Sequence, residues 1–403
     1  MRARPEALLV LFAIALGGAS AAADERRVSF PHALELARGA APDVLVARGR
    51  EGVARAEIGV AGVYPNPAVI VGTSTQAARA SVGVSIPLLI LGQRGAAIEA
   101  SKSELVTVQL DSVVVWNEVR AGTSRAFVAL WAMQRVATER AETARIARSL
   151  ETIVTARVDV GATPAIDALR VRAERLRADA DASEAELLVS AFASELGRWL
   201  GVAEPSSIRV DGDPDVPRDP PPFTELAARL PQNPSVRREL ADVAAANARE
   251  ARERAFARPI PVLDLGADFA DPTLPATNYR AQLAIDVPLF NQRGAQIDRE
   301  RSLAGAARAR SNAARARASA SLEVAYRTFQ ASSGRAKALA EGVVSATELA
   351  ARATRESYEL GRAQLVAVLD SEKARSDARA ALVDALATRA NAWIDVELAL
   401  GSP

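Results

Sequence analysis

The sequence shows no credible catalytic constellation, and the side chains that bind soft metals are almost missing from it. Its single histidine is His32, it has no cysteine, and its two methionines are Met1 and Met133. A soft-metal site needs several such ligands. The sequence also contains no GxxxxGK[ST] loop that would bind ATP. We therefore expect a protein that is not an enzyme and that holds neither a cofactor nor a resident metal.

Polar side chains instead recur at every second position of short segments. Asp264 and Asp268 alternate with apolar residues over 263–269, and Gln282 and Asp286 do so over 280–287. Segment 81–86 alternates Ser or Gly with Val or Ile, and the less regular 69–71 adds a fourth segment. This alternation predicts strands with one polar and one apolar face.

These segments belong to a unit that occurs twice, about 200 residues apart. Segment 85–95 returns as 286–294, and both copies end in Gln-Arg-Gly. Each copy reads as helix, short β-hairpin, very long helix, turn and long helix. We predict a first repeat over 24–201, with a hairpin at about 67–88 and a tip turn at about 160–164. The second repeat covers 223–403, with a hairpin at about 261–288 and a tip turn at about 360–364; a linker rich in Pro and Asp covers 202–222.

The long helices follow from two stretches without proline, 95–160 and 294–360. At 1.5 Å per residue each stretch would be roughly 100 Å long. The helix before each hairpin and the helix after each tip turn together nearly equal the long helix, so they can stack end to end along it. Gly161 and Gly361 suit the left-handed residue that ends a helix, and Thr163 is placed to cap the next helix, with Pro164 as its first residue.

Composition also favours long helices over a compact domain. Hydrophobic residues make up 49% of the chain but aromatic residues only 4%, which suits narrow seams between helices. The four tryptophans are more plausible as packing residues than as ligand platforms. The net charge of +1 gives no argument for binding nucleic acid, and the many arginines fit solvated helix faces. Residues 1–23 read as a signal peptide, with basic residues before an apolar run that is too short to span a bilayer.

Two hairpins in one chain need partners. A lone hairpin is marginal in water, and open strand edges are not tolerated in lipid. Three chains would pool twelve strands, an even number as in outer-membrane barrels. We predict a mainly α fold with a small β part, in which the duplicated unit forms an α-helical barrel and a shared trimeric transmembrane β-barrel. Asp264, Asp268, Gln282 and Asp286 would face its lumen. The alternative is a soluble sheet packed on helices.

The repeated motifs resemble the TolC-like outer-membrane efflux proteins over nearly the whole mature chain. The paired Pro-Leu…Gln-Arg-Gly motifs and the segment 357–365, Ser-Tyr-Glu-Leu-Gly-Arg-Ala-Gln-Leu, carry this resemblance, and 87–95 is most similar to the CzcC-like cation-efflux branch. The resemblance implies a homotrimer in the outer membrane of a Gram-negative bacterium, with outer-membrane lipid around its barrel and most of the chain in the periplasm. Its partners would be a periplasmic membrane-fusion adaptor and an inner-membrane pump of the resistance-nodulation-division type. Many relatives carry a lipidated cysteine and this chain has none, so we expect the barrel alone to anchor it.

The resemblance also assigns roles to the tip turns. It implies adaptor contacts at Val160, Gly161, Ala162, Thr163, Leu360, Gly361, Arg362 and Ala363. The nearby Asp159, Asp167 and Asp370 are candidates for an aperture ring that favours cations; ordinary helix-end capping and solvation is the alternative. The expected function is passive conduction of heavy-metal cations or drugs, and the sequence does not identify the solute. The competing functions are a periplasmic coiled-coil adaptor and a structural protein without a pore.

Overall fold

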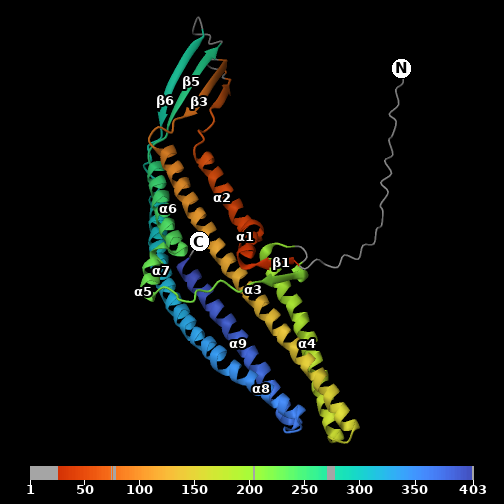
Figure 1. Cartoon of the computed structure of the whole chain (residues 1–403). Helices are drawn as coiled ribbons and strands as arrows, with labels where there is room; N and C mark the ends of the chain where they lie inside the picture. Colours follow the sequence, from red (N-terminus) through yellow and green to blue (C-terminus); the bar gives the residue numbers. More distant parts are fainter. Residues whose placement is uncertain (1–25, 74, 76–78, 203–204, 270–276, 402–403) are drawn as a thin grey trace, which may run out of the picture.

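The computed structural model describes residues 26–73, 75, 79–202, 205–269 and 277–401; the predicted signal peptide lies outside them. The described chain is mainly helical with a small sheet part, as predicted from the sequence. Long helices run side by side from a β-sheet at one end to two turns at the other (Figure 1). None of the described helices is both long and apolar enough to cross a membrane.

The first half of the chain contains the longest helix. After β1 (Arg26–Ser29) and α1 (Phe30–Ala40), α2 (Pro42–Ala61) leads to the hairpin of β2 (Ala68–Gly72) and β3 (Ala80–Pro87). Helix α3 (Gln93–Asp159) has 67 residues, which makes it about 100 Å long. It is followed by the return helix α4 (Ala165–Leu200).

The second half repeats this order after a short connection. The connection comprises η1 (Pro205–Ser207), β4 (Ile208–Asp211), α5 (Phe223–Arg229) and η2 (Leu230–Gln232). Then follow α6 (Pro234–Phe256), the hairpin of β5 (Pro261–Phe269) and β6 (Asn278–Ile285), α7 (Gly294–Ala338), η3 (Leu339–Val344), α8 (Ser345–Glu359) and α9 (Leu365–Leu400).

The second long helix is not the uninterrupted α-helix expected over 294–360. Its segment η3 is π-helical. Gly342 lies inside this segment and has a low helix propensity. Just beyond it, the hydroxyl of Ser345 donates to the carbonyl oxygen of Glu341 at 2.8 Å, and that of Thr347 donates to Val343 at 2.9 Å. Such bonds back to the preceding turn compete with the helix's own hydrogen bonds and loosen it.

The shorter helices stack end to end, as their lengths indicated. Helix α4 ends at Gly201, where an added Cβ would lie 2.7 Å from the carbonyl oxygen of Ala40, just before α2. Helix α9 ends at Gly401, where an added Cβ would lie 2.0 Å from Pro234, the first residue of α6. Both glycines have φ +66°, so the chain turns away within one residue while the next helix begins against it.

A buried asparagine joins the second of these stacks. The side-chain amide of Asn233 donates to the carbonyl oxygen of Ala399 at 2.7 Å, near the end of α9. Its Oδ1 accepts from the backbone N–H groups of Ser235 and Val236 at the start of α6. The matching residue before α2 is Ala41, which has no polar side chain to form such bonds.

Four apolar cores among the described residues hold the helices together, and the smallest packs Val128 of α3 against Ile394 of α9. A core at the middle of the first half packs Phe127, Leu130 and Trp131 of α3 against α1, α4 and the strands β1 and β4. A second core packs α5, α7 and α9 around Leu322. A third joins the ends of α3, α4, α8 and α9 around Val154. These cores include or contact Trp131, Trp199 and Trp393, which agrees with a packing role for the three tryptophans.

The segment predicted as a linker contains secondary structure. Strand β4 pairs in parallel with β1, and the carbonyl oxygen of the Gln134 side chain accepts from the N–H of Val210 at 2.9 Å. Both strands are only four residues long and their pairing depends on a contact far apart in sequence. Local patterns therefore give no signal for them.

Candidate functional site

The two hairpins form one antiparallel sheet in the order β2-β3-β5-β6. The register places Asp264 opposite Ser85 on one side and opposite Gln282 on the other. Since opposite residues share a face of the sheet, the predicted polar set Asp264, Asp268 and Gln282 lies on one face. Val84 and Leu265, also opposite each other, lie on the other face, which is apolar.

Two details of the polar face differ from the sequence expectation. Asp268 is paired with Arg280, whose Nη1 lies 3.0 Å from Oδ2, so the face carries a cation that the sequence reasoning left out. Arg280 has the same parity as Gln282 and Asp286 in the alternating segment, which was the signal for it. Asp286 follows the last residue of β6 and lies just outside the sheet.

The tip turns lie at the other end of the molecule (Figure 1), and the two turns have the same backbone hydrogen bonds. Gly161 donates to Val158 at 2.9 Å, and Ala162 donates to Arg157 at 2.8 Å. In the second turn, the equivalent bonds from Gly361 and Arg362 measure 2.9 and 2.8 Å. Both glycines are left-handed, with φ +73° and +74°. These are Schellman turns, and Val160 and Leu360 are exposed on them.

The helix after the first tip turn begins one residue later than expected. Pro164, in an extended conformation, is the N-cap of α4, and no side chain caps the helix. The predicted cap by Thr163 is therefore wrong. The first turn of α4 contains Asp167, whose charge is favourable near a helix N-terminus.

The structure brings the two tips together through α3 and α8. The guanidinium of Arg157 lies 4.6 Å from the ring centre of Tyr358 and donates to the carbonyl oxygen of Glu359 at 2.7 Å. Val154, Val171 and Val368 pack around the same tyrosine in the tip core. In the sequence, Arg157 interrupts a coiled-coil spacing, which was the only signal for this contact.

The three candidate aperture carboxylates differ in their surroundings. Asp167 lies 3.7 Å from Arg170, one turn further along its own helix. Asp159 and Asp370 are exposed, and the structure gives neither an ion pair with any described residue. The helix-end alternative thus has a physical basis for Asp167, while no cationic side chain of the described residues pairs with Asp159 or Asp370.

A cluster of ion pairs lies behind the tips, where α3, α8 and α9 meet. Arg375 pairs with Glu372 at 2.9 Å, and Arg379 pairs with Glu139 at 2.7 Å and with Glu348 at 2.6 Å. Arg375 and Glu372 are buried. Burial opposes the charge of Arg379, but its hydrogen bonds to Glu348 and Glu139 raise its pKa above the ordinary value. Sequence reasoning missed this cluster because its members looked like solvated helix charges.

The repeated Gln-Arg-Gly motif forms the joint between the sheet and the helices. The buried Gln93 accepts from the N–H of Leu91 at 3.0 Å and donates to the carbonyl oxygen of Pro259 at 3.2 Å. Arg94 donates to the carbonyl oxygen of Gly62 at 2.7 Å. In the second copy, Arg293 pairs with Glu253 at 2.7 Å.

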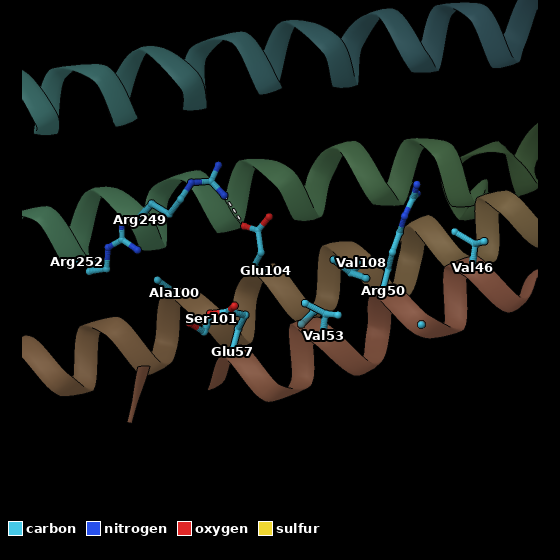
Figure 2. A pocket seen from close by; sticks show the side chains of 12 residues that line it. Val46, Arg50, Val53, Glu57, Ala100, Ser101, Glu104, Val108, Arg249 and Arg252 are labelled. Carbon is cyan, nitrogen blue, oxygen red and sulfur yellow. Dashed lines mark hydrogen bonds and ion pairs between the residues drawn. The ribbon is translucent and has the colours of Figure 1, made fainter. Parts of the chain in front are cut away.

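An apolar groove runs below this joint between α2, α3 and α6 (Figure 2). Val46 and Val53 of α2 and Val108 of α3 line it, and Arg249 of α6 pairs with Glu104 across it. Val46, Val53 and Val60 are exposed and seven residues apart. This is the repeat of a coiled-coil seam, and all three side chains are more than half exposed in the described chain.

Comparison with known proteins gives a consistent result. Residues 227–402 match the family model described as outer membrane efflux protein. The chain is 24% identical to the cobalt-zinc-cadmium resistance protein CzcC of Cupriavidus metallidurans over 342 residues, which are 84% of this chain and 82% of that protein.

Solved structures with the same fold include two outer-membrane proteins. The CmeC outer membrane channel of Campylobacter jejuni superposes with a TM-score of 0.76 at 14% identity, over 92% of this chain and 85% of that chain. The outer membrane protein VceC of Vibrio cholerae superposes with a TM-score of 0.74 at 16% identity, over 92% of this chain and 96% of that chain.

Proposed function

Because the chain belongs to the outer membrane efflux protein family, whose members are channels and not enzymes, we propose that it is the passive outer-membrane conduit of a tripartite export system. It is an outer-membrane protein with most of its residues on the periplasmic side. In this proposal three chains close a twelve-stranded barrel, and their helices close a tunnel below it. An adaptor in the periplasm would connect the tunnel to an energy-consuming inner-membrane pump.

The observation that carries this proposal is the sheet. It has one polar and one apolar face, and large side chains of the apolar face, such as Val82, Leu265 and Leu283, are exposed. Within the described residues, β2 and β6 form its two outer edges and pair with no further strand. Exposed edges and an exposed apolar face are both costly in water. Joining the edges of three sheets and surrounding them with lipid removes both costs.

The helices support the same closure. The exposed seam of Val46, Val53 and Val60 lies on an outermost helix of the chain, where a second chain can cover it. The two tip turns, with exposed Val160 and Leu360, would then form a ring at the periplasmic end. We assign the adaptor contact to this ring.

For the solute we propose heavy-metal cations, because the relative CzcC is a cobalt-zinc-cadmium resistance protein. A drug is the competing solute. The test is the survival of a cell that lacks this chain, on cobalt, zinc or cadmium salts and on drugs, with and without the restored gene. Metal sensitivity that the gene rescues is the expected result. Rescue on drugs alone would refute the metal assignment and leave the conduit intact.

We further propose that Asp159 and Asp370 belong to a cation-attracting aperture, with Asp167 in a lesser role because Arg170 lies beside it. Asp264, Asp268, Gln282 and the adjoining Asp286 would line the barrel lumen. In planar bilayers, D370A should lower the preference for cations, while D395A, which removes a partner of Arg125 at the middle of the molecule, should not. Unchanged cation selectivity in D370A would mean that Asp370 is an ordinary solvated helix residue without a role in the aperture.

A further inference from the structure

Large apolar side chains are exposed where the sheet meets the helices. We call six of them the collar: Tyr64, Ile90, Leu91, Val287, Leu289 and Phe290. Their exposed fractions run from 39% for Leu91 to 101% for Phe290. They come from three of the four segments that join the strands to the helices, at the base of the sheet in Figure 1. Six such side chains at one level of the molecule need an apolar environment.

The collar continues the apolar face of the sheet. On β6, Leu283 and Ile285 are exposed and lie on the face opposite Gln282, and Val287 keeps the same spacing just beyond the strand. The apolar surface therefore does not stop where the hydrogen-bonded strands stop. It extends toward the helices into the joint.

The lengths of the strands make this extension useful. Strands β3 and β6 each have 8 residues. At about 3.4 Å per residue and a tilt of about 40°, such a strand rises roughly 20 Å. The apolar band of an outer-membrane barrel is about 25 Å tall. One further layer of side chains at the collar supplies about the difference.

The backbone under the collar is fixed, so its side chains stay outside. Leu91 is held by the buried Gln93, which also reaches Pro259 of the neighbouring joint segment. Ile90 donates to the carbonyl oxygen of Leu88, and Leu289 donates to that of Val287, each at 2.9 Å. These tight turns present the apolar side chains outward.

Two arginines lie at the collar with their charge uncompensated. Arg94 stacks on Tyr64 at 4.6 Å and bonds the carbonyl oxygen of Gly62, and Arg258 donates to the carbonyl oxygen of Leu91 at 2.9 Å. Within the described chain, the contacts of both arginines are with backbone carbonyl oxygens and an aromatic ring, and neither forms an ion pair with a carboxylate. Arg293 of the same joint differs, because it forms an ion pair with Glu253, which also pairs with Arg252.

We propose that the collar is seated in the periplasmic leaflet of the outer membrane and binds its phospholipids. The apolar side chains enter the acyl region, and Arg94 and Arg258 bind the anionic phosphates of the headgroups. This inference rests on the proposed function, since it needs the sheet to lie in the membrane. It adds that the membrane reaches past the strands to the joint with the helices.

The test places a tryptophan at the collar of the full chain. F290W is reconstituted in vesicles of phosphatidylethanolamine and phosphatidylglycerol, with and without brominated acyl chains, and the emission of the four native tryptophans is subtracted. We expect blue-shifted emission that brominated lipid quenches. The matched variant V160W, at the exposed tip, should be red-shifted and unquenched.

Three results would overturn the collar. Red-shifted emission of F290W that brominated lipid does not quench would place this side chain in water. Blue-shifted emission without quenching would mean that protein covers it. The third concerns the arginines: the wild-type chain should melt at a higher temperature with phosphatidylglycerol than with phosphatidylcholine alone. R94Q/R258Q should lose this difference while R293Q keeps it, and a difference that persists in R94Q/R258Q would refute the headgroup contact. Chains that do not float with vesicles at all would instead refute the proposed function.

Discussion

Replacing Asn233 by alanine should loosen the junction between α9 and α6 without touching any apolar contact. The side chain of Asn233 is buried and makes three hydrogen bonds, two to the start of α6 and one to Ala399 near the end of α9. In N233A the first N–H groups of α6 and the Ala399 carbonyl oxygen lose their partners together.

The size of the effect follows from these bonds. Loss of a side-chain N-cap costs about 1 kcal/mol. An unsatisfied carbonyl oxygen at a buried site adds about 1–3 kcal/mol. We therefore expect N233A to destabilise the junction by about 2–4 kcal/mol, which is roughly a 30- to 1000-fold change in a local opening equilibrium. N233S keeps an acceptor for the cap but is too short to reach Ala399, so it should lie between N233A and the wild type.

Amide hydrogen exchange measures this opening directly. Protection of Ser235, Val236 and the following turn of α6 should fall in N233A by the factors above. The control N247A makes the same substitution at an exposed position of the same helix and should leave protection unchanged. If N233A and N247A exchange alike, the hydrogen bonds of Asn233 do not hold the junction and the reasoning is refuted.

Three further predictions concern the tips, the buried ion pairs and the joint. G361A should lower the free energy of unfolding by about 1 kcal/mol, because alanine is strained at the left-handed φ of this residue. G305A, in open space within a helix, should raise it by up to about 1 kcal/mol. Melting temperatures that shift in the same direction in both variants would contradict this. R375M should lower the free energy of unfolding by about 2–4 kcal/mol because it leaves the buried Glu372 without Arg375, and R375M/E372M should regain part of this loss. Chemical denaturation measures both values, and no recovery in the double variant would argue against the pairing of Arg375 with Glu372. Burial opposes the charge of Glu253, but its arginine hydrogen bonds lower its pKa. Its stabilisation is thus complete above the unfolded value of about 4.3 and lost as pH falls through the lower folded value, a dependence that E253Q should remove.

The sequence predicted the long elements well because their signals are local. The prolines at 42 and 234 and the glycines at 161 and 361 mark helix ends in the chain itself, and the alternation in β5 and β6 marks the polar face. The short pair β1 and β4 and the contact of Arg157 with Tyr358 depend on residues far apart in sequence. No local pattern encodes such contacts.

The burial and pairing of charged side chains could be predicted less well than the helix ends marked by glycines, for a related reason. Glu372 and Arg375 have the same residue types and helical spacing as the exposed pair Glu142 and Arg145. Only the packing of α3 and α8 against α9 decides that the first pair is buried. The sequence therefore predicted where carboxylates lie at the tips and the sheet, but not which of them are neutralised by a neighbour, as Asp268 is by Arg280.

The π-helical segment η3 records a difference between the two halves of the chain. From Gly294 to Gly361 the chain is one residue longer than from Gly95 to Gly161. An extra residue in an α-helix would turn everything after it by about 100°. A π-turn accommodates one extra residue locally, so the same face of α8 still packs against α9. The segment thus has the form of a single-residue insertion that was absorbed after duplication, and deleting one residue within 339–344 should restore an unbroken α-helix without moving the second tip.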